Sequence, residues 1–290
     1  MPPVDPTVPF DRMPWAALDP TSFTDLLRRV RPEGLPSLSG ELPATGPEGP
    51  SEFRGIPHAT TILAIRYADG VVMAGDRRAT EGYSIAQRAI EKVFPADRHS
   101  GVSIAGAAGP AMDMVRLFQT ELEHYEKVEG TALSLEGKAN KLAGMVRSNL
   151  PMAMQGLAVV PIFAGYDLRR RSGRIFKYDV TGGRYEESDH YSTGSGGREA
   201  RSTIKKRYTR GLSRDETVQI ALEALFDASE EHAGTGGPDV LRKIYPNIVS
   251  ISVRGFEVVP DDEIAALFTS LLEQRTSEGA FLSEEHTVEG

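Results

Sequence analysis

The chain has 290 residues, of which 40% are hydrophobic and 26% are charged, so it is long enough to bury a sizeable core. Its formal net charge of −8 argues against a surface for nucleic acid or anionic membranes, and the absence of cysteine excludes disulfides, thiolate metal sites and cysteine nucleophiles. No apolar run approaches the roughly 18 residues that cross a bilayer, and the N-terminus lacks the features of a signal peptide, so we expect a cytoplasmic protein.

Residues 1–59 differ in composition from the rest of the chain. Twelve of the 19 prolines precede Thr60, together with many Gly and Ser residues, and such a segment cannot bury enough surface to fold alone. We therefore expect a largely disordered leader. Within it, the stretch TSFTDLLRRV predicts a short amphipathic helix near residues 22–30, with Ser22 as its N-cap and an apolar stripe formed by Phe23, Leu26, Leu27 and Val30.

A series of strands and helices follows the leader. TTILAIRY (60–67) and GVVMAGD (70–76) are β-branched and apolar, and the ADG between them is a hairpin signal. Residue patterns predict further strands over 101–109, 159–167, 174–180 and 247–253, and helices over 111–128, from 134 onward, and over 198–208, 214–231 and 261–274. Residues 181–197 are expected as a loop, and a solvated hairpin loop is expected at Arg169, Arg170 and Arg171.

The order of these elements indicates the fold class. Blocks of strands alternate with pairs of helices, and the strands are apolar enough to be covered on both faces. This order predicts an α+β fold of two packed sheets with helices on each outer face. Because no internal repeat is present, residues 60–275 are expected to form a single domain, followed by a flexible C-terminal tail over 276–290.

The two threonines that begin the first strand point to a particular chemistry. Cutting the chain before Thr60 would create a residue with both a hydroxyl and a free α-amine, whose ordinary pKa of roughly 7.7 to 8.0 leaves part of it neutral at cellular pH. Nucleophile and base would then lie in one residue, whereas the attached leader keeps the amine as an amide that cannot act as a base. The alternative is that two β-branched residues merely begin a strand.

Asp76 and Lys92 are expected to tune that pair of groups. An ammonium beside Thr60 favours loss of protons from the hydroxyl and the amine, and it needs a carboxylate partner to stay charged in a partly buried site. Asp76 ends the second strand and Lys92 opens the KVF stretch. By themselves, the two residues are also compatible with a structural ion pair.

A series of ordered motifs runs between residues 58 and 275: TTI, GVVMAGDRRAT, EKVF, SIAGAAG, MVRSNL, MAMQGLAVVP, GRIFKYDVTGG, TGSGG and TGGPDV. In this order they resemble the β-type subunit of the bacterial 20S proteasome found in actinobacteria, a member of the N-terminal nucleophile hydrolases. The leader stretch TSFTDLL resembles a stretch in the propeptides of such subunits. The resemblance implies a four-layer αββα sandwich of two antiparallel sheets, a threonine peptidase, and a propeptide over residues 1–59.

The resemblance also implies a role for each matching residue. Thr60 matches the nucleophile that autocatalytic removal of the propeptide exposes, and Asp76 and Lys92 match its acidic and basic partners. The N–H of Gly106 matches the oxyanion-hole donor, where a side chain would block the substrate carbonyl, and Ser195 matches a serine near the threonine amine. A first specificity pocket, which would favour large hydrophobic residues, is expected to be lined by Ala79, Ile90, Phe94, Ile104, Ala108 and Met112.

Two positions depart from the family pattern. The residue before the threonine is usually glycine, whereas Ala59 carries a Cβ that restricts the backbone at the cleavage point between Ala59 and Thr60. In DASEEHAGTGGPD, His232 stands where the family has an aspartate that supports the serine and the threonine amine. Glu231 could replace that aspartate only if the loop slipped in register, while Thr235 of the same loop matches.

The leading hypothesis is a self-processing threonine endopeptidase, a β subunit of a bacterial 20S proteasome that needs no metal and no organic cofactor. The implied partners are α-type subunits, further β subunits in stacked heptameric rings, a regulatory ATPase ring bound through the α rings, and unfolded protein substrates. One alternative is an inactive or unprocessed structural β subunit, because of Ala59 and His232. Another alternative is a stand-alone HslV-like peptidase.

Overall fold

The computed structural model describes residues 60–81 and 84–285. All of these residues belong to one compact unit. The predicted leader, its short helix near residues 22–30 and the Ala59 side of the cleavage point therefore lie outside the described residues and stay predictions.

Two five-stranded sheets form the centre of the domain, and all of their strand pairs are antiparallel. The first sheet has, in spatial order, the strands β10 (His190–Gly194), β1 (Thr61–Tyr67), β2 (Gly70–Gly75), β11 (Asn247–Ser252) and β12 (Gly255–Val258). The second sheet has the strands β5 (Val93–Asp97), β6 (Ser100–Gly106), β7 (Val159–Asp167), β8 (Ser172–Tyr178) and β9 (Arg184–Glu187). A separate small hairpin consists of β3 (Ala79–Glu81) and β4 (Ser84–Gln87).

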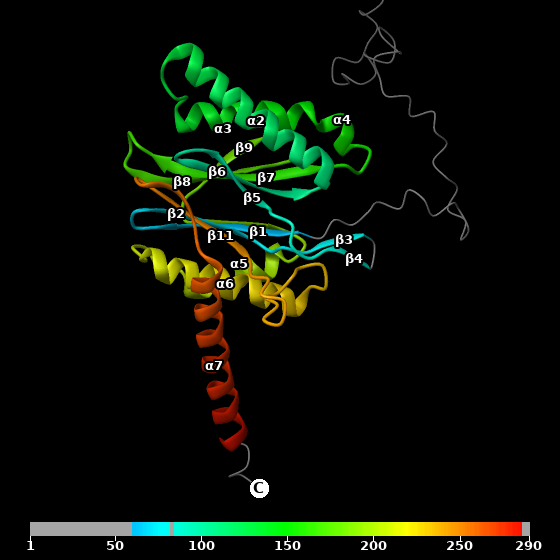
Figure 1. Ribbon diagram of the computed structural model, residues 1–290, viewed down its shortest axis with the longest axis vertical. Helices are drawn as coiled ribbons and strands as arrows, with labels where there is room; N and C mark the ends of the chain where they lie inside the picture. Colours follow the sequence, from blue (N-terminus) through cyan, green and yellow to red (C-terminus); the bar gives the residue numbers. More distant parts are fainter. Residues whose placement is uncertain (1–59, 82–83, 286–290) are drawn as a thin grey trace, which may run out of the picture. The chain divides into compact units, whose positions relative to one another are not determined.

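Helices cover the outer faces of both sheets. The helices α2 (Ala108–Glu129) and α3 (Leu135–Ser148) lie on the second sheet, and α5 (Gly197–Arg207) and α6 (Arg214–Glu231) lie on the first (Figure 1). The one-turn helix α4 (Leu150–Ala153) leads from α3 toward β7. The layers are thus helices, sheet, sheet and helices, which confirms the predicted α+β sandwich.

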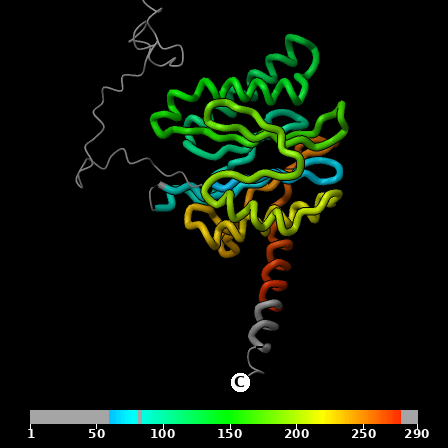
Figure 2. Tube along the Cα trace, turned by 180° about the vertical axis from the view of Figure 1, so that it is seen from behind, coloured from blue at the N-terminus to red at the C-terminus, as the bar shows by residue number. Residues whose placement is uncertain are grey.

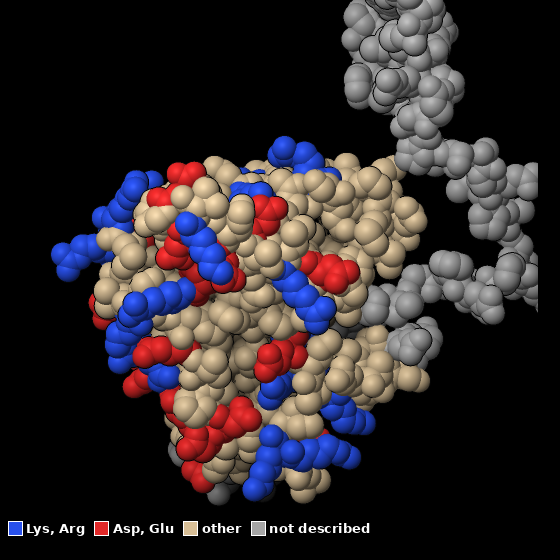
Figure 3. Space-filling view, turned by 45° about the horizontal axis from the view of Figure 1, so that its top comes forward, with Lys and Arg blue, Asp and Glu red and all other residues tan. Residues whose placement is uncertain are grey.

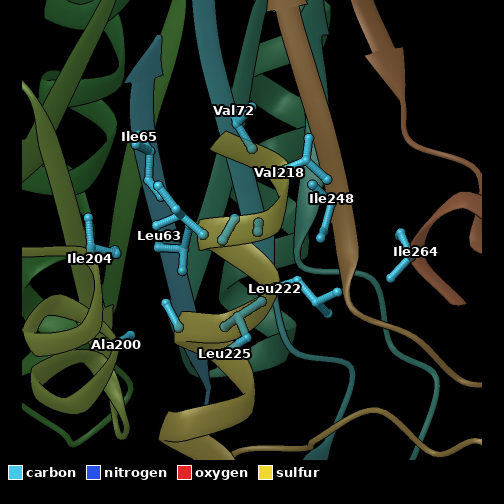
Figure 4. Packing of buried hydrophobic residues seen from close by; sticks show 14 of the residues in the cluster. Leu63, Ile65, Val72, Ala200, Ile204, Val218, Leu222, Leu225, Ile248 and Ile264 are labelled. Atoms are coloured by element: carbon cyan, nitrogen blue, oxygen red, sulfur yellow. The ribbon is translucent and has the colours of Figure 1, made fainter. Parts of the chain in front are cut away.

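Strand β1 shows how a continuous apolar run serves both faces of a sheet. Successive side chains of a strand point in opposite directions, so Ile62 and Ala64 join the cluster between the sheets while Leu63 and Ile65 face the helices. All four are fully buried. Burial of each Leu or Ile contributes about 1.5–3 kcal/mol to the free energy of unfolding. Figure 4 shows the helix-facing cluster, with labelled side chains that include Val72, Ile204, Val218, Leu222, Leu225 and Ile248.

Capping residues define where the helices begin and end. At the start of α6, Ser213 Oγ accepts a hydrogen bond from the N–H of Glu216 at 3.3 Å, and the Glu216 carboxylate accepts one from the N–H of Ser213 at 2.8 Å. Helix α2 ends at Gly130, whose φ of 67° is the left-handed conformation that favours glycine. The helix predicted over 214–231 has the observed bounds because its capping box is local in sequence.

The loop expected over 181–197 is a wrong prediction, because that segment contains β9 and β10. Both strands lie at the edge of their sheets and pair on one side only. Their sequences, RYEE and HYSTG, are polar and largely exposed or half-buried. Edge strands of this kind carry no apolar alternation, so pattern alone does not identify them.

The last helix, α7 (Asp261–Glu285), is longer than the sequence predicts. The predicted end near Gln274 is wrong, because the helix continues to Glu285. The flexibility expected for the tail over 276–290 stays a prediction, and 286–290 lie outside the described residues. Arg275 of α7 forms ion pairs with Asp227 and Glu230 of α6. No proline, which would end a helix, occurs after Arg275 in the sequence. Figures 1 and 2 show α7 running away from the sheets.

Charged side chains are mixed on the surface. On the face drawn in Figure 3, Lys and Arg side chains alternate with Asp and Glu, and neither sign forms a continuous area. The three arginines between β7 and β8 are exposed in the turn that joins these strands, which confirms the predicted hairpin loop. Among the described residues, no helix combines the length and the apolar character of a membrane span.

Candidate active site

Thr60 lies directly before β1, at the end of the first sheet where β10 finishes. Its side chain is withdrawn from solvent, with 7% of the residue exposed. Its carbonyl oxygen accepts a hydrogen bond from the N–H of Ser195 at 2.8 Å and a longer one from Ser195 Oγ at 3.4 Å. The pairing of β1 with β10, in which Thr61 stands opposite Gly194, brings these segments together across 135 residues of sequence.

Asp76 follows β2 and is placed beside Thr61 by the pairing of β1 with β2. The N–H of Asp76 donates to the carbonyl of Thr61 at 3.1 Å, and the carboxylate in turn accepts from the N–H of Thr61 at 2.7 Å. The second carboxylate oxygen accepts from the N–H groups of Arg78 at 3.0 Å and Gly236 at 2.9 Å. Asp76 is fully buried, so these donors replace the water that its charge would otherwise bind.

Lys92 supplies the counter-charge to Asp76. Its Nζ donates to Asp76 Oδ1 at 2.7 Å and to the carbonyl of Arg78 at 2.6 Å, and 5% of the residue is exposed. Burial lowers the pKa of Lys92 below its ordinary value, although the neighbouring Asp76 carboxylate opposes that shift. Gly75 leaves room for this arrangement, since a Cβ there would lie 3.1 Å from Lys92 Cβ.

Gly106 is required for a reason that differs from the one inferred from sequence. Its φ of 120° is a backbone conformation that L side chains rarely adopt, and a Cβ would lie 2.0 Å from the carbonyl oxygen of Ala158. The clash is therefore with the protein's own backbone, before any substrate is considered. The same carbonyl accepts a hydrogen bond from the N–H of Ala107 at 2.9 Å, which holds this turn against β7.

One cleft brings the predicted nucleophile and the predicted specificity pocket together. Its walls include Thr60, Lys92 and Gly106. All six residues expected in the first specificity pocket also line it: Ala79, Ile90, Phe94, Ile104, Ala108 and Met112. The cleft thus combines a hydroxyl-bearing residue, a buried ammonium and a largely apolar wall, which is a geometry suited to attack on a peptide with a hydrophobic side chain.

The loop after α6 contacts the residue that follows Thr60. Thr235 Oγ1 lies 2.8 Å from Thr61 Oγ1, which also accepts from the N–H of Gly196 at 2.9 Å. His232 is the C-cap of α6, and its Nδ1 accepts from the N–H of Gly234 at 3.3 Å. Among the described hydrogen bonds, the imidazole of His232 contacts neither Thr60 nor Ser195. The expected correspondence of His232 to the family's aspartate stays a prediction.

Sequence reasoning missed three residues of the site. Thr61, Arg78 and Gly236 each bond the Asp76 carboxylate through a backbone N–H, and backbone donors carry no residue-type signal. The glycine pair in TGGPD was the available cue for Gly236. A Cβ on Gly236 would lie 2.7 Å from Arg78 Cβ, so the close approach of the two segments needs glycine.

Two sequence comparisons with known proteins identify the family of this chain. The sequence model of the family described as "Proteasome subunit" matches residues 56–243, which include every predicted catalytic residue. The "Proteasome subunit beta" of Acidimicrobium ferrooxidans is 59% identical over 223 residues, which are 76% of this chain and 82% of that protein. The chain therefore belongs to the proteasome subunit family, and within that family it is a bacterial β-type subunit.

Proposed function

We propose that this chain is a self-processing threonine endopeptidase with Thr60 as its nucleophile. The observation that carries the proposal is the single cleft in which Thr60, Lys92 and Gly106 meet an apolar pocket. Membership of a family of threonine peptidases supports the same activity. No step of the proposed reaction needs a metal or an organic cofactor.

The proposed reaction begins with proton transfer within Thr60. The neutral α-amine accepts the hydroxyl proton, and the alkoxide forms a bond to the carbonyl carbon of the scissile peptide. The ammonium of Lys92, held by Asp76, favours the negative oxygen electrostatically. The N–H of Gly106 is the proposed donor to the oxyanion that develops on the substrate carbonyl.

Collapse of this intermediate breaks the carbon–nitrogen bond. The protonated amine of Thr60 returns its proton to the leaving amine, so an ester between the peptide and Thr60 remains. Water, deprotonated by the same amine, then attacks the ester and releases the second product. Ser195, which bonds the carbonyl of Thr60, is proposed to hold the residue in position during both steps.

During maturation the same hydroxyl is proposed to attack the carbonyl carbon of Ala59, so that an ester to Thr60 forms as the Ala59–Thr60 C–N bond breaks and the proton passes to the freed α-amine. Water then hydrolyses the ester and releases the leader. The mature enzyme would then prefer large hydrophobic residues before the cut, because the pocket walls include Ile90, Phe94 and Ile104. The proposed setting is a core particle of stacked heptameric β rings between rings of α-type subunits. A regulatory ATPase ring is proposed to feed it unfolded proteins.

Intact mass spectrometry of the chain co-expressed with an α-type partner tests this proposal. A mature species that begins at Thr60 is expected for the wild type, and the Thr60→Ala variant is expected to keep its full length. The processed particle should hydrolyse a peptide with a leucine before the cut, and the variant should not. A wild type that stays full length inside assembled rings would instead identify a structural β subunit.

A further inference from the structure

A second, small pocket of about 30 Å³ is lined by three arginines and does not share a lining residue with the cleft. Two of its arginines, Arg77 and Arg78, come directly after Asp76, and the third, Arg88, follows β4. The opposite wall is formed by the loop after α6 and the residues before β11, namely Gly236, Gly237, Asp239, Ile244, Tyr245 and Pro246.

The positive charges of this arginine pocket are incompletely matched. Arg78 donates to a neutral partner, the carbonyl of Ala233, at 2.9 Å. Arg77 lies 3.7 Å from Glu91, whose side chain is 60% exposed, and the buried Nε of Arg77 has no hydrogen-bond partner among the described residues. A buried guanidinium N–H without an acceptor costs free energy until an acceptor is supplied.

The carboxylate in the pocket is already occupied. Asp239 accepts from the Arg242 side chain at 2.7 Å and from the Arg242 N–H at 2.9 Å. These bonds, with a smaller contribution from the charge of Arg88, lower the pKa of Asp239. The pocket is therefore lined by three arginines and by one carboxylate, which is hydrogen-bonded to a fourth arginine outside the pocket.

The arginine pocket is joined to the catalytic groups by the backbone. The N–H groups of Arg78 and Gly236, one from each wall, both donate to Asp76 Oδ2. Ala79, the next residue after Arg78, lines the cleft that contains Thr60. The consecutive residues Arg77, Arg78 and Ala79 thus line two neighbouring pockets, the first two the arginine pocket and the third the apolar cleft.

We propose that the arginine pocket binds the carboxylate of an acidic side chain of the peptide being cleaved. This inference rests on the proposed peptidase function and adds a second determinant of specificity to the apolar pocket. Guanidinium groups suit the role because their planar N–H groups bond both oxygens of a carboxylate. A free anion such as phosphate has the same chemistry, so the experiment must separate the two sources.

Binding to the assembled core particle tests the proposal without requiring turnover. Fluorescent peptides with one leucine and a reduced, uncleavable amide bond after it carry either Glu or Gln at each flanking position in turn. At one position or more, the Glu peptide is expected to bind about threefold to tenfold more tightly than its Gln partner, as measured by fluorescence anisotropy. The Arg88→Gln variant should bring the two affinities close together, and Arg88→Lys should retain part of the difference.

Arg98→Gln is the matched control, because Arg98 is an exposed arginine in the turn between β5 and β6, at the opposite end of that hairpin from Lys92 and Gly106. It should behave as the wild type does. A wild type without Glu preference at any position, or a preference that persists in Arg88→Gln, would overturn the proposal. Arg88-dependent binding of inorganic phosphate without any Glu preference would also overturn it, in favour of a free anion.

The peptidase proposal fails in a different way. If the particle binds the Glu peptides selectively but cleaves no ordinary peptide, Thr60 is not the nucleophile and the arginine pocket stands. If the particle cleaves ordinary peptides but shows no Arg88-dependent preference among the uncleavable ones, the peptidase proposal stands and the arginine pocket does not take peptide carboxylates.

Discussion

Lys92 Nζ lies 2.7 Å from Asp76 Oδ1, and both side chains are almost fully removed from solvent. Each charge has lost its hydration and depends on the other, because the remaining partners of the pair are backbone groups. This ion pair joins the end of β2 to the start of β5, and so it connects the two sheets at the site of Thr60.

Removing the charge of Asp76 should damage both stability and activity. In Asp76→Asn, Lys92 keeps its place in the interior without a carboxylate, and the expected loss in the free energy of unfolding is about 3 kcal/mol. Denaturant unfolding of the purified chain measures this loss, and peptide hydrolysis by the particle should fall at least tenfold. The control is Glu123→Gln, which breaks the exposed pair between Glu123 and Lys127 and should change neither quantity. Equal effects of the two variants would contradict the assigned importance of the buried pair.

The lowered pKa of Lys92 predicts how activity and stability depend on pH. Burial lowers this pKa in the folded state below its ordinary value of 10.5, so the alkaline limb of kcat/KM should fall at a lower pH than an ordinary lysine would give. Between the folded and unfolded pKa values the unfolded chain binds more protons, so this group makes the folded state more stable as pH rises through that window. The difference in unfolding free energy between wild type and Lys92→Met, followed from pH 8 to about 10.5, isolates the contribution. A difference that stays constant with pH would contradict the shift.

Two glycines near the site should respond oppositely to alanine. Gly106→Ala places a methyl 2.0 Å from the Ala158 carbonyl at a φ of 120°, and should cost at least about 2 kcal/mol of stability and abolish hydrolysis. Gly109→Ala, three residues on in α2, meets no atom within 4 Å and should stabilise the chain by about 0.5–1 kcal/mol. Thermal unfolding of both variants measures the contrast. Tolerance of Gly106→Ala would show that the turn can shift without loss.

His232 should be dispensable in this chain. Its imidazole accepts from the N–H of Gly234 at the end of α6, and its replacement by alanine should change stability by about 0.5 kcal/mol or less. Cleavage of the leader and peptide hydrolysis should stay within about threefold of wild type, since a factor of ten corresponds to 1.4 kcal/mol of barrier. Single-turnover kinetics of processing, followed by mass, measure this. A loss beyond tenfold would show that the imidazole takes a direct part in the reaction.

The candidate site was predictable to different degrees in its different parts. Thr60, Asp76, Lys92 and Gly106 are found through motifs, and the structure places all four around one cleft or in direct contact with its walls. The reason for Gly106 was not predictable, since the obstacle is the carbonyl of Ala158, which β7 brings alongside β6. The roles of these residues in catalysis stay predictions until the variants are measured.

The secondary structure was likewise predictable for some elements and not for others. Strands with continuous apolar runs, such as β1 and β7, and helices with local caps, such as α6, were predicted close to their observed bounds. The short strands β3, β4, β5 and β12 were missed, together with both polar edge strands of the expected loop. Such strands are defined by the partner they pair with, and a partner distant in sequence leaves no trace in a short window.

The sequence by itself determined the layered α+β fold, the family, and the residue types of the site, because hydrophobic periodicity, helix caps and ordered motifs are all local properties of the chain. Only the tertiary structure decided which groups donate hydrogen bonds to the buried Asp76 carboxylate, and which arginines line the neighbouring pocket. Gly236 donates to Asp76 across 160 residues, and Thr235 meets Thr61 across 174. Contacts at that separation arise from the pairing and packing of whole sheets and helices, so no local pattern specifies them.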